Sequence, residues 1–350
     1  MLRSQNVYSD FFENPATADS SGLSFRFNNV NYIKNYEGFN DFSEGYTLLG
    51  YFAQPTIQYY VNKKVAVTGG FHIQKYFGEP LYTTVRPMFS VVINLGSVSF
   101  IKLGTITNRP EQKLLEPIRH NELFLTDNIE EGVQFKHSGK IFETDTRLDW
   151  EQYIFSGSEY PEKIAFSSGN CLNFDIKRLQ VVLRGQLLAA HIGGQIDNSN
   201  SNVSTIVNAA LGADFILGKK QTGRYTAFAY YLPSADMSPT KRMMYDHGFG
   251  SLVGLKYERG RWNAGLKYWY GTHRLSTHEN PIFRNISLQT PGYFEDERQL
   301  IIPHVFRTFD FGKNVSGGII ADAYFDVLNY DFDYTLSFIV KINFVRSILP

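Results

Sequence analysis

The sequence predicts an all-β fold: a single antiparallel, up-and-down transmembrane β-barrel of about sixteen strands, with about fourteen or eighteen as alternatives. Three observations lead to this prediction. Apolar and polar residues alternate over long segments, short and long connections follow one another in turn, and the chain ends in one such alternating segment. From Tyr334 to Phe344 every even position is apolar, whereas the odd positions include Thr335, Ser337 and Lys341. A period of two over this length gives a strand one apolar and one polar face.

The same period divides nearly the whole chain into strands. Residues 1–21 lack it, and we expect them to form an N-terminal periplasmic or lumenal segment before a barrel of residues 22–350. The predicted strands are 22–34, 45–60, 64–77, 82–95, 98–108, 130–138, 140–155, 163–177, 179–192, 203–217, 223–232, 248–258, 261–273, 298–311, 314–328 and 331–345. Segments 98–108 and 298–311 alternate poorly, so we expect a shifted boundary or a β-bulge there.

The connections between these strands have a regularity of their own. After every even strand the predicted turn is tight and rich in Gly, Asn and Lys, at 61–63, 95–97, 138–140, 177–178, 218–222, 259–261 and 312–314. After the odd strands most are longer, at 35–44, 109–129, 193–202, 233–247 and 274–297. Bacterial barrels have short periplasmic turns and longer outer loops, and an even strand number follows when both ends are periplasmic.

Composition narrows the function classes. Lys+Arg and Asp+Glu are both 34, so the balanced charge gives no electrostatic case for nucleic acid. The mean hydropathy of −0.25 is compatible with a barrel, because only alternate strand residues face lipid. Cys171 is the single cysteine, and we interpret it as a tolerated thiol in a strand. The eight histidines lack metal-ligand spacing, so we expect no metal and no cofactor. A soluble β-sandwich or propeller is the rival fold, but its strands average only about 5–6 residues.

The long aromatic-bordered strand at the C-terminus resembles the closing strand of Gram-negative outer-membrane β-barrels, and resemblance to that class covers nearly the whole chain. This resemblance implies an integral outer-membrane protein that is surrounded by outer-membrane lipid. No apolar signal-peptide core is visible after Met1, so we expect a mature or engineered chain in which residues 1–4 need not be native.

A short N-terminal motif is similar to two barrel families. Asn14, Pro15 and Ala16 follow Phe11 and Phe12, as in a motif before the first strand of the PorP/SprF family of type IX secretion and of FadL-like transporters of hydrophobic compounds. The resemblance implies either a subunit of a secretion machine or a segment that plugs the lumen. The alternative is an ordinary turn at Asn14–Pro15.

The strongest polar signal is a charged stripe on segment 140–155. Its members share one strand face and are Glu143, Asp145, Arg147, Asp149 and Glu151. Because lipid exposure of these charges would cost several kcal/mol, we expect them to line the lumen. They would either shape cation passage or form an internal network with basic residues across the barrel, such as Arg184, Lys256, Lys267 or Lys341.

The third outer loop, 109–129, is a second candidate. In sixteen-strand general porins the loop at this position folds inward and narrows the pore, and the similarity here is one of position and length. Its charged residues include Arg109, Glu111, Lys113, Glu116 and Arg119. The alternative is a surface loop with a short helical turn.

Two groups of His and Ser are candidates for a hydrolytic site. A nucleophilic serine needs a base within hydrogen-bond reach and a third group that orients the base. His247 and Ser251 lie about 13 Å apart along one strand, which is too far for a hydrogen bond. The group from His273 to His278 has no carboxylate partner evident in the sequence. We therefore expect a protein that is not an enzyme.

Several functions remain open. The first is a pore for small polar solutes with a charged lumen. The second is a membrane-embedded structural subunit of an outer-membrane secretion, assembly or nutrient-uptake complex, with outer-membrane or periplasmic protein partners. The FadL-like resemblance implies a third, transport of hydrophobic compounds, and a soluble glycan-binding β-protein is a fourth.

Overall fold

The computed structural model describes residues 22–107, 109–194, 196–199, 201–287 and 289–349. Sixteen antiparallel strands close into one barrel in which sequence neighbours are spatial neighbours and β1 pairs with β16. The prediction of an all-β, sixteen-strand, up-and-down barrel is confirmed. The strands are β1 Gly22–Phe39, β2 Glu44–Tyr60, β3 Val65–Tyr76, β4 Thr84–Asn94, β5 Ser99–Thr107, β6 Ile129–Ser138, β7 Phe142–Gln152, β8 Lys163–Ile176, β9 Leu179–Ile192, β10 Ser204–Lys219, β11 Gly223–Asp236, β12 His247–Arg259, β13 Trp262–Thr272, β14 Glu297–Asp310, β15 Val315–Asp326 and β16 Phe332–Leu349.

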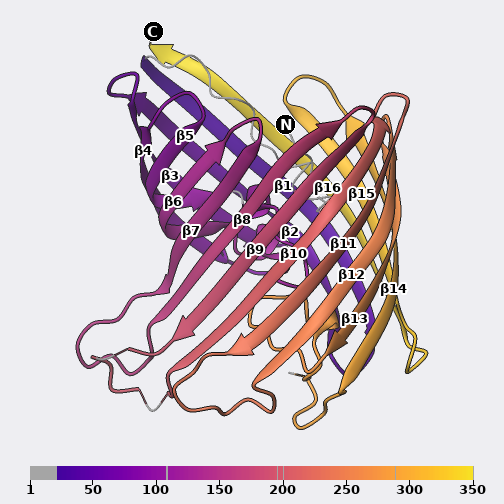
Figure 1. Cartoon of the computed structure of the whole chain (residues 1–350). Coiled ribbons are helices and arrows are strands. Elements are labelled where there is room, and N and C mark those ends of the chain that lie inside the picture. The colour runs from indigo at the N-terminus through magenta and orange to yellow at the C-terminus, as the bar shows by residue number, and fades with distance from the viewer. Residues whose placement is uncertain (1–21, 108, 195, 200, 288, 350) are drawn as a thin grey trace.

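The seam between the two ends of the chain is long. It runs from Leu23 opposite Leu349 to Glu37 opposite Tyr334. Because β1 continues to Phe39, the long first loop predicted at 35–44 is wrong, and only residues 40–43 separate β1 from β2. In Figure 1 the chain end and the short turns lie at one end of the barrel and the long connections at the other.

The two strand faces differ as the alternation predicted. On β16, Leu336 and Phe338 are 54% and 41% exposed on the outer wall, whereas Thr335 and Ser337 point inward and are buried. Apolar side chains therefore meet the lipid, and the closed ladder satisfies the backbone groups that lipid cannot. No helix among the described residues is long and apolar enough to cross a membrane.

The two poorly alternating strands have different explanations. On β5, the residues that line the lumen change from even positions (Phe100, Lys102) to odd ones (Thr105, Thr107) across Gly104, whose φ is +97°. A left-handed residue of this kind shifts the facing of a strand and favours glycine. On β14 buried and exposed residues alternate regularly, but three of the buried inward residues, Leu300, Ile302 and Phe306, are apolar.

Those apolar inward residues exist because the lumen is filled. The connection between β5 and β6 contains η1 (Arg109–Gln112) and α2 (Leu123–Thr126), and the connection between β13 and β14 contains η2 (Pro281–Phe283). We call residues 109–128 the first inner loop and residues 273–296 the second inner loop, the latter being described except for residue 288. Both bury apolar side chains against the inner wall. The main cluster is Leu114, Leu115, Ile118, Leu188, Ala190, Ala210, Phe228, Tyr230, Leu232, Leu252, Trp269, Ile282, Phe283, Leu300, Ile302 and Tyr324.

We predict that Trp269→Ala lowers the free energy of unfolding by about 3–5 kcal/mol, because a large buried side chain leaves a cavity. Trp269 is fully buried, and its ring centroid lies 5.2 Å from that of Phe283 in the second inner loop. Trp262→Ala is the matched control, since Trp262 is 50% exposed on the outer wall. Urea unfolding of the barrel in lipid vesicles measures both variants, and an equal loss in the two would contradict a packed lumen.

Candidate functional site: the inner loops and the outer mouth

The charged stripe of β7 has three buried members and two that are more accessible. Asp145, Arg147 and Asp149 are 5%, 1% and 3% exposed and point away from the outward-facing Trp150. Glu143 is partly buried. Glu151 is exposed at the outer end of the strand.

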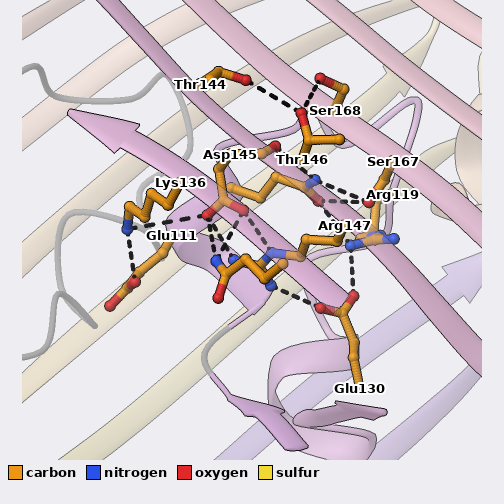
Figure 2. A network of polar contacts seen from close by, with 12 residues as sticks. Glu111, Arg119, Glu130, Lys136, Thr144, Asp145, Thr146, Arg147, Ser167 and Ser168 are labelled. Atoms are coloured by element: carbon orange, nitrogen blue, oxygen red, sulfur yellow. Dashed lines mark hydrogen bonds and ion pairs between the residues drawn. The ribbon is translucent and has the colours of Figure 1, made fainter. Parts of the chain in front are cut away.

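The buried part of the stripe forms an ion network with β6 and the first inner loop (Figure 2). Arg147 donates Nε and Nη2 to the two carboxylate oxygens of Asp145, each at 2.9 Å, and Nη1 to Glu130 at 2.7 Å. Glu130 also accepts from Arg119 of the first inner loop at 2.9 Å. Lys136 Nζ lies 3.0 Å from Glu111 Oε2 of the same loop. Three cations (Arg119, Lys136 and Arg147) thus balance three carboxylates (Glu111, Glu130 and Asp145). Removal of one buried member would leave an opposite charge without its partner, which is strongly destabilising.

The first inner loop lies directly against the barrel wall. A Cβ on Gly169 of β8 would lie 2.5 Å from the Gln112 carbonyl oxygen, so only glycine allows this approach. Gln186 Nε2 donates to the Lys113 carbonyl at 2.8 Å. The side chain of Arg109 lies outside the described part of the chain. Asn14, Pro15 and Ala16 also lie outside it, so their role as a plug remains a prediction.

Two of the basic residues that the sequence suggested as partners of the stripe have carboxylate neighbours on other strands. Arg184 forms its ion pair with Asp214 at 2.7 Å, and Lys256 lies 3.6 Å from Glu258. Asp145 of the stripe has its cations on β7 itself, with Arg147 at 2.9 Å, and on β6, with Lys136 at 4.0 Å. Sequence spacing alone does not reveal this pairing.

The second inner loop is a part of the interior that the sequence analysis missed. Arg274, 1% exposed, holds it in place by donating to Glu279 at 3.1 Å, to the Leu232 carbonyl at 3.1 Å and to the Pro117 carbonyl of the first inner loop. Asn280 Nδ2 donates to Glu116 Oε1 at 3.0 Å. The available signal was the apolar Ile282–Phe283 pair after Pro281 in a polar loop.

A small cavity lies where the inner loops meet the wall. A cavity of about 40 Å³ is lined by groups that include Lys34, Glu122, Lys267 and Asp322. This is room for one or two water molecules. Burial and the Lys34 ammonium lower the pKa of the nearby His120 to about 4, so this imidazole is neutral at physiological pH. Burial opposes ionisation of Glu122, but Lys34 outweighs it and holds the pKa of that carboxyl below its usual value.

A chain of hydrogen bonds lies at the outer mouth. His278 Nε2 is 2.8 Å from Glu151 Oε1, and His278 Nδ1 is 2.7 Å from the Thr277 hydroxyl. The backbone N–H of His120 donates to the His278 carbonyl at 2.6 Å, which ties the two inner loops together here. His278 therefore does have a carboxylate partner, contrary to the sequence analysis. That partner is 127 residues away in the chain and becomes a neighbour only because the second inner loop folds inward.

A second histidine in the same loop has a carboxylate neighbour but a different setting. His273 Nε2 lies 3.3 Å from Asp296 Oδ1, and both side chains are well exposed. Its ring stacks on Tyr245 with centroids 4.3 Å apart. Among the residues that the structure describes, no group of three His, Cys, Asp or Glu side chains is arranged to hold a metal ion.

Comparison with known proteins places the chain in a family. The family model described as lipid A 3'-O-deacylase-type matches residues 15–348, nearly the whole length. The chain belongs to this family. None of the curated protein sequences matches it.

Solved structures share the barrel. OprD from Pseudomonas aeruginosa superposes with a TM-score of 0.56 at 10% identity, covering 94% of this chain and 97% of OprD. A loop L8 deletion mutant of OmpT from Vibrio cholerae gives 0.54 at 9% identity, covering 93% and 100%. OccAB4 from Acinetobacter baumannii gives 0.53 at 10% identity, covering 93% and 99%. At this identity the likeness shows the fold, and it supports placement of the protein in the outer membrane among its lipids.

Two expectations change in consequence. The expectation of a protein that is not an enzyme is contradicted, because the matching family is of a deacylase type. Spacing along the chain does not reveal a histidine–carboxylate pair whose members, such as His278 and Glu151, lie 127 residues apart. The PorP/SprF and FadL-like resemblances are not supported by these comparisons, whereas the resemblance to outer-membrane barrels as a class is confirmed.

We predict that Arg147→Met lowers the free energy of unfolding by about 3–5 kcal/mol, because Glu130 and Asp145 would remain buried without their guanidinium. The first inner loop should also loosen and become cleavable by trypsin at Lys113 or Arg119. Arg307→Met is the matched control, because Arg307 is exposed on the outer wall over Trp262. A variant whose loop resisted trypsin as well as the wild type would contradict the anchoring role of the network.

Proposed function

We propose that the protein hydrolyses an acyl ester of a lipid A-type glycolipid at the outer mouth of the barrel. The observation that carries this proposal is the hydrogen-bonded series Thr277, His278 and Glu151. The family to which the chain belongs supplies the substrate class. The packed lumen supports a role at the mouth, because substrate passage through the middle would require both inner loops to move.

The arrangement assigns a role to each side chain. An ionised Glu151 only accepts hydrogen bonds, so the proton of neutral His278 lies on Nε2 and its lone pair on Nδ1. Nδ1 then accepts the Thr277 hydroxyl proton as that oxygen attacks the ester carbonyl. The ester bond to the sugar then breaks as His278 returns the proton to the departing sugar oxygen, and the acyl group remains as an ester on Thr277. Water, activated by the same base, attacks that ester and releases the fatty acid and the free threonine. If water takes the place of Thr277, the same base activates it directly.

The surroundings of Glu151 suit a lipid substrate. Exposed aromatic residues flank Glu151 in the chain, with the ring centroids of Trp150 and Tyr153 6.2 Å apart and those of Tyr153 and Phe155 5.2 Å apart. Tyr153 and Phe155 are 62% and 72% exposed. Aromatic side chains of this kind gather at the boundary between lipid and water, where acyl chains and sugar meet.

We predict that His278→Gln lowers the rate of lipid A deacylation at least about a hundredfold, because the general base is lost. Glu151→Gln should also lower the deacylation rate, because the amide would no longer hold the imidazole of His278 in the tautomer with its proton on Nε2. The measurement is mass spectrometry of hexa-acylated lipid A incubated with the detergent-solubilised protein, scored by loss of one acyl chain.

His273→Gln is the matched control, a histidine of the same loop beside a carboxylate, and it should keep full activity. Thr277→Val separates the two mechanisms, since it abolishes activity only if the threonine is the nucleophile. Equal activity in His278→Gln and His273→Gln would refute the assignment.

Passage of small polar solutes is a second candidate. The observation that favours it is a polar vestibule of about 310 Å³ that reaches from the periplasmic side of the lumen to Glu111 of the first inner loop. The accessible Glu143 would then add to the charge of the passage.

We expect no steady conductance from the wild-type barrel in a planar bilayer, because both inner loops pack apolar side chains against the inner wall across the middle of the lumen. The pair Ile282→Ser and Phe283→Ser, which weakens the apolar packing, should produce open steps. Steady open steps from the wild type, with a cation preference weakened by Glu143→Gln and Asp149→Asn, would instead establish a pore.

A further inference from the structure

The ladder between β4 and β5 is incomplete at its outer end. Only five residue pairs join the two strands, and the outermost of them is Ser90–Gly104. Yet β4 starts at Thr84, and β5 continues to Thr107. Over these same residues β4 still pairs with β3, and β5 still pairs with β6. The wall therefore has a local opening that lies between β4 and β5 alone.

The sequence builds this opening into the backbone. Gly104 has a φ of +97°, and a Cβ there would collide with the Phe89 carbonyl oxygen, so β5 can turn away from β4 here only at a glycine. The Phe89 N–H donates to the Thr105 hydroxyl at 3.1 Å. Positions two residues apart in a strand point their N–H groups to the same neighbour, and two residues before Phe89 is Pro87, which has no N–H. Proline is confined to strand edges of this kind.

The polar vestibule of about 310 Å³ reaches this opening. Phe89 lines the vestibule and yet belongs to the outer wall, where it is 61% exposed. Thr105 and Thr107, which lie on β5 beyond its ladder with β4, line the vestibule as well. Strand backbone without a sheet partner is tolerated at membrane depth only where it is covered by protein or lines a cavity. The opening therefore joins the lipid-facing wall to the lumen.

Charged side chains bridge the outer end of the opening. Arg86 of β4 lies 3.1 Å from Glu131 of β6 and 3.7 Å from Asp127 of the first inner loop. All three side chains are well exposed. Exposed ion pairs contribute little to stability, so these pairs can separate without unfolding of the barrel. They form a latch across the opening that does not seal it.

The chemistry on both sides of the opening specifies what enters it. On the outside, Phe89 faces the hydrocarbon of the membrane. On the inside, the otherwise polar lining of the vestibule includes apolar side chains of β4 and β5, among them Met88, Val92 and Phe100. A polar headgroup that entered from the lipid would lose its hydration, whereas a hydrocarbon chain would not. We propose that the opening admits one acyl chain of a membrane lipid, which lies along these apolar side chains while its headgroup stays at the membrane surface.

This lateral site is independent of ester hydrolysis at the outer mouth. None of its residues belongs to the Thr277–His278–Glu151 series, so His278→Gln should leave entry of the acyl chain unchanged. Failure of one proposal therefore does not imply failure of the other.

Photo-crosslinking of the full-length wild-type barrel in phospholipid vesicles tests the proposal. The probe is a phosphatidylcholine with a diazirine at the end of one acyl chain, and mass spectrometry of peptides locates the adducts. We expect adducts on Met88 and Phe100 inside the lumen as well as on Leu103, which is 43% exposed on the outer wall. Phe306 is the matched internal control, because it lines another cavity of about 340 Å³ beside an unbroken β13–β14 ladder. It should carry no adduct.

Two results with the wild type would overturn the proposal. One is a set of adducts on outward residues alone. The other is equal labelling of Phe306 and Phe100, because the probe would then reach the lumen by another route. A phosphatidylcholine with the diazirine in its headgroup should leave Phe100 unmarked, and marking by that lipid as strong as by the first would contradict entry of the chain alone.

Two variants test the path itself. Met88→Trp, which fills the route behind the opening, should remove the adduct on Phe100 and keep the one on Leu103. Arg86→Gln removes the latch and should increase the labelling of Phe100, whereas Arg307→Gln on the outer wall should leave it unchanged. Undiminished labelling of Phe100 in a folded Met88→Trp barrel would contradict the proposed path.

Discussion

Closure of the sheet is the constraint on which the rest of the structure depends. Lipid offers no partner for a backbone N–H or C=O group, so a strand edge cannot remain open within the membrane. The β1–β16 seam removes that edge over fifteen residue pairs from Leu23–Leu349 to Glu37–Tyr334. Once the sheet is closed, each strand has one face toward lipid and one toward an enclosed space. Everything specific to this protein is then decided by how that space is occupied.

The enclosed space is treated differently along its length. In the middle, two loops from the outer end fold inward and bury apolar side chains against residues such as Trp269 and Leu300, much as in the core of a soluble domain. The same loops carry charges inward, and these are neutralised by β6 and β7 in a closed network around Arg147. The apolar contacts bury most of the surface between the loops and the wall. The ion network determines which part of the first inner loop lies against which strand.

Filling the middle separates two chemical environments. At the outer mouth the second inner loop brings His278 to Glu151 beside exposed aromatic residues, a setting suited to an ester at the lipid surface. At the periplasmic end a vestibule of about 310 Å³ is lined by polar residues that include Arg26 and Lys102. A through-going pore would have merged these environments. The family to which the chain belongs, of the lipid A 3'-O-deacylase type, is consistent with chemistry at one end.

The sequence by itself indicated the barrel, a strand number of about sixteen and the direction of the strand faces. These follow from local periodicity: Leu336 and Phe338 outward and Thr335 and Ser337 inward are readable from spacing alone. The charged residues of β7 could be placed on one face for the same reason. Their partners could not be predicted in this way. Glu130, which binds Arg147, is on β6 and is shared with Arg119 of the inward-folded first inner loop. Leu300 and Ile302 disturb the expected alternation of β14 because they are apolar and yet face the lumen. There they pack in one cluster with Ile282 and Phe283 of the second inner loop, which only the tertiary structure shows. Only the tertiary structure brought His278 to Glu151, because a contact across 127 residues depends on the path of a loop and leaves no periodic trace in the chain.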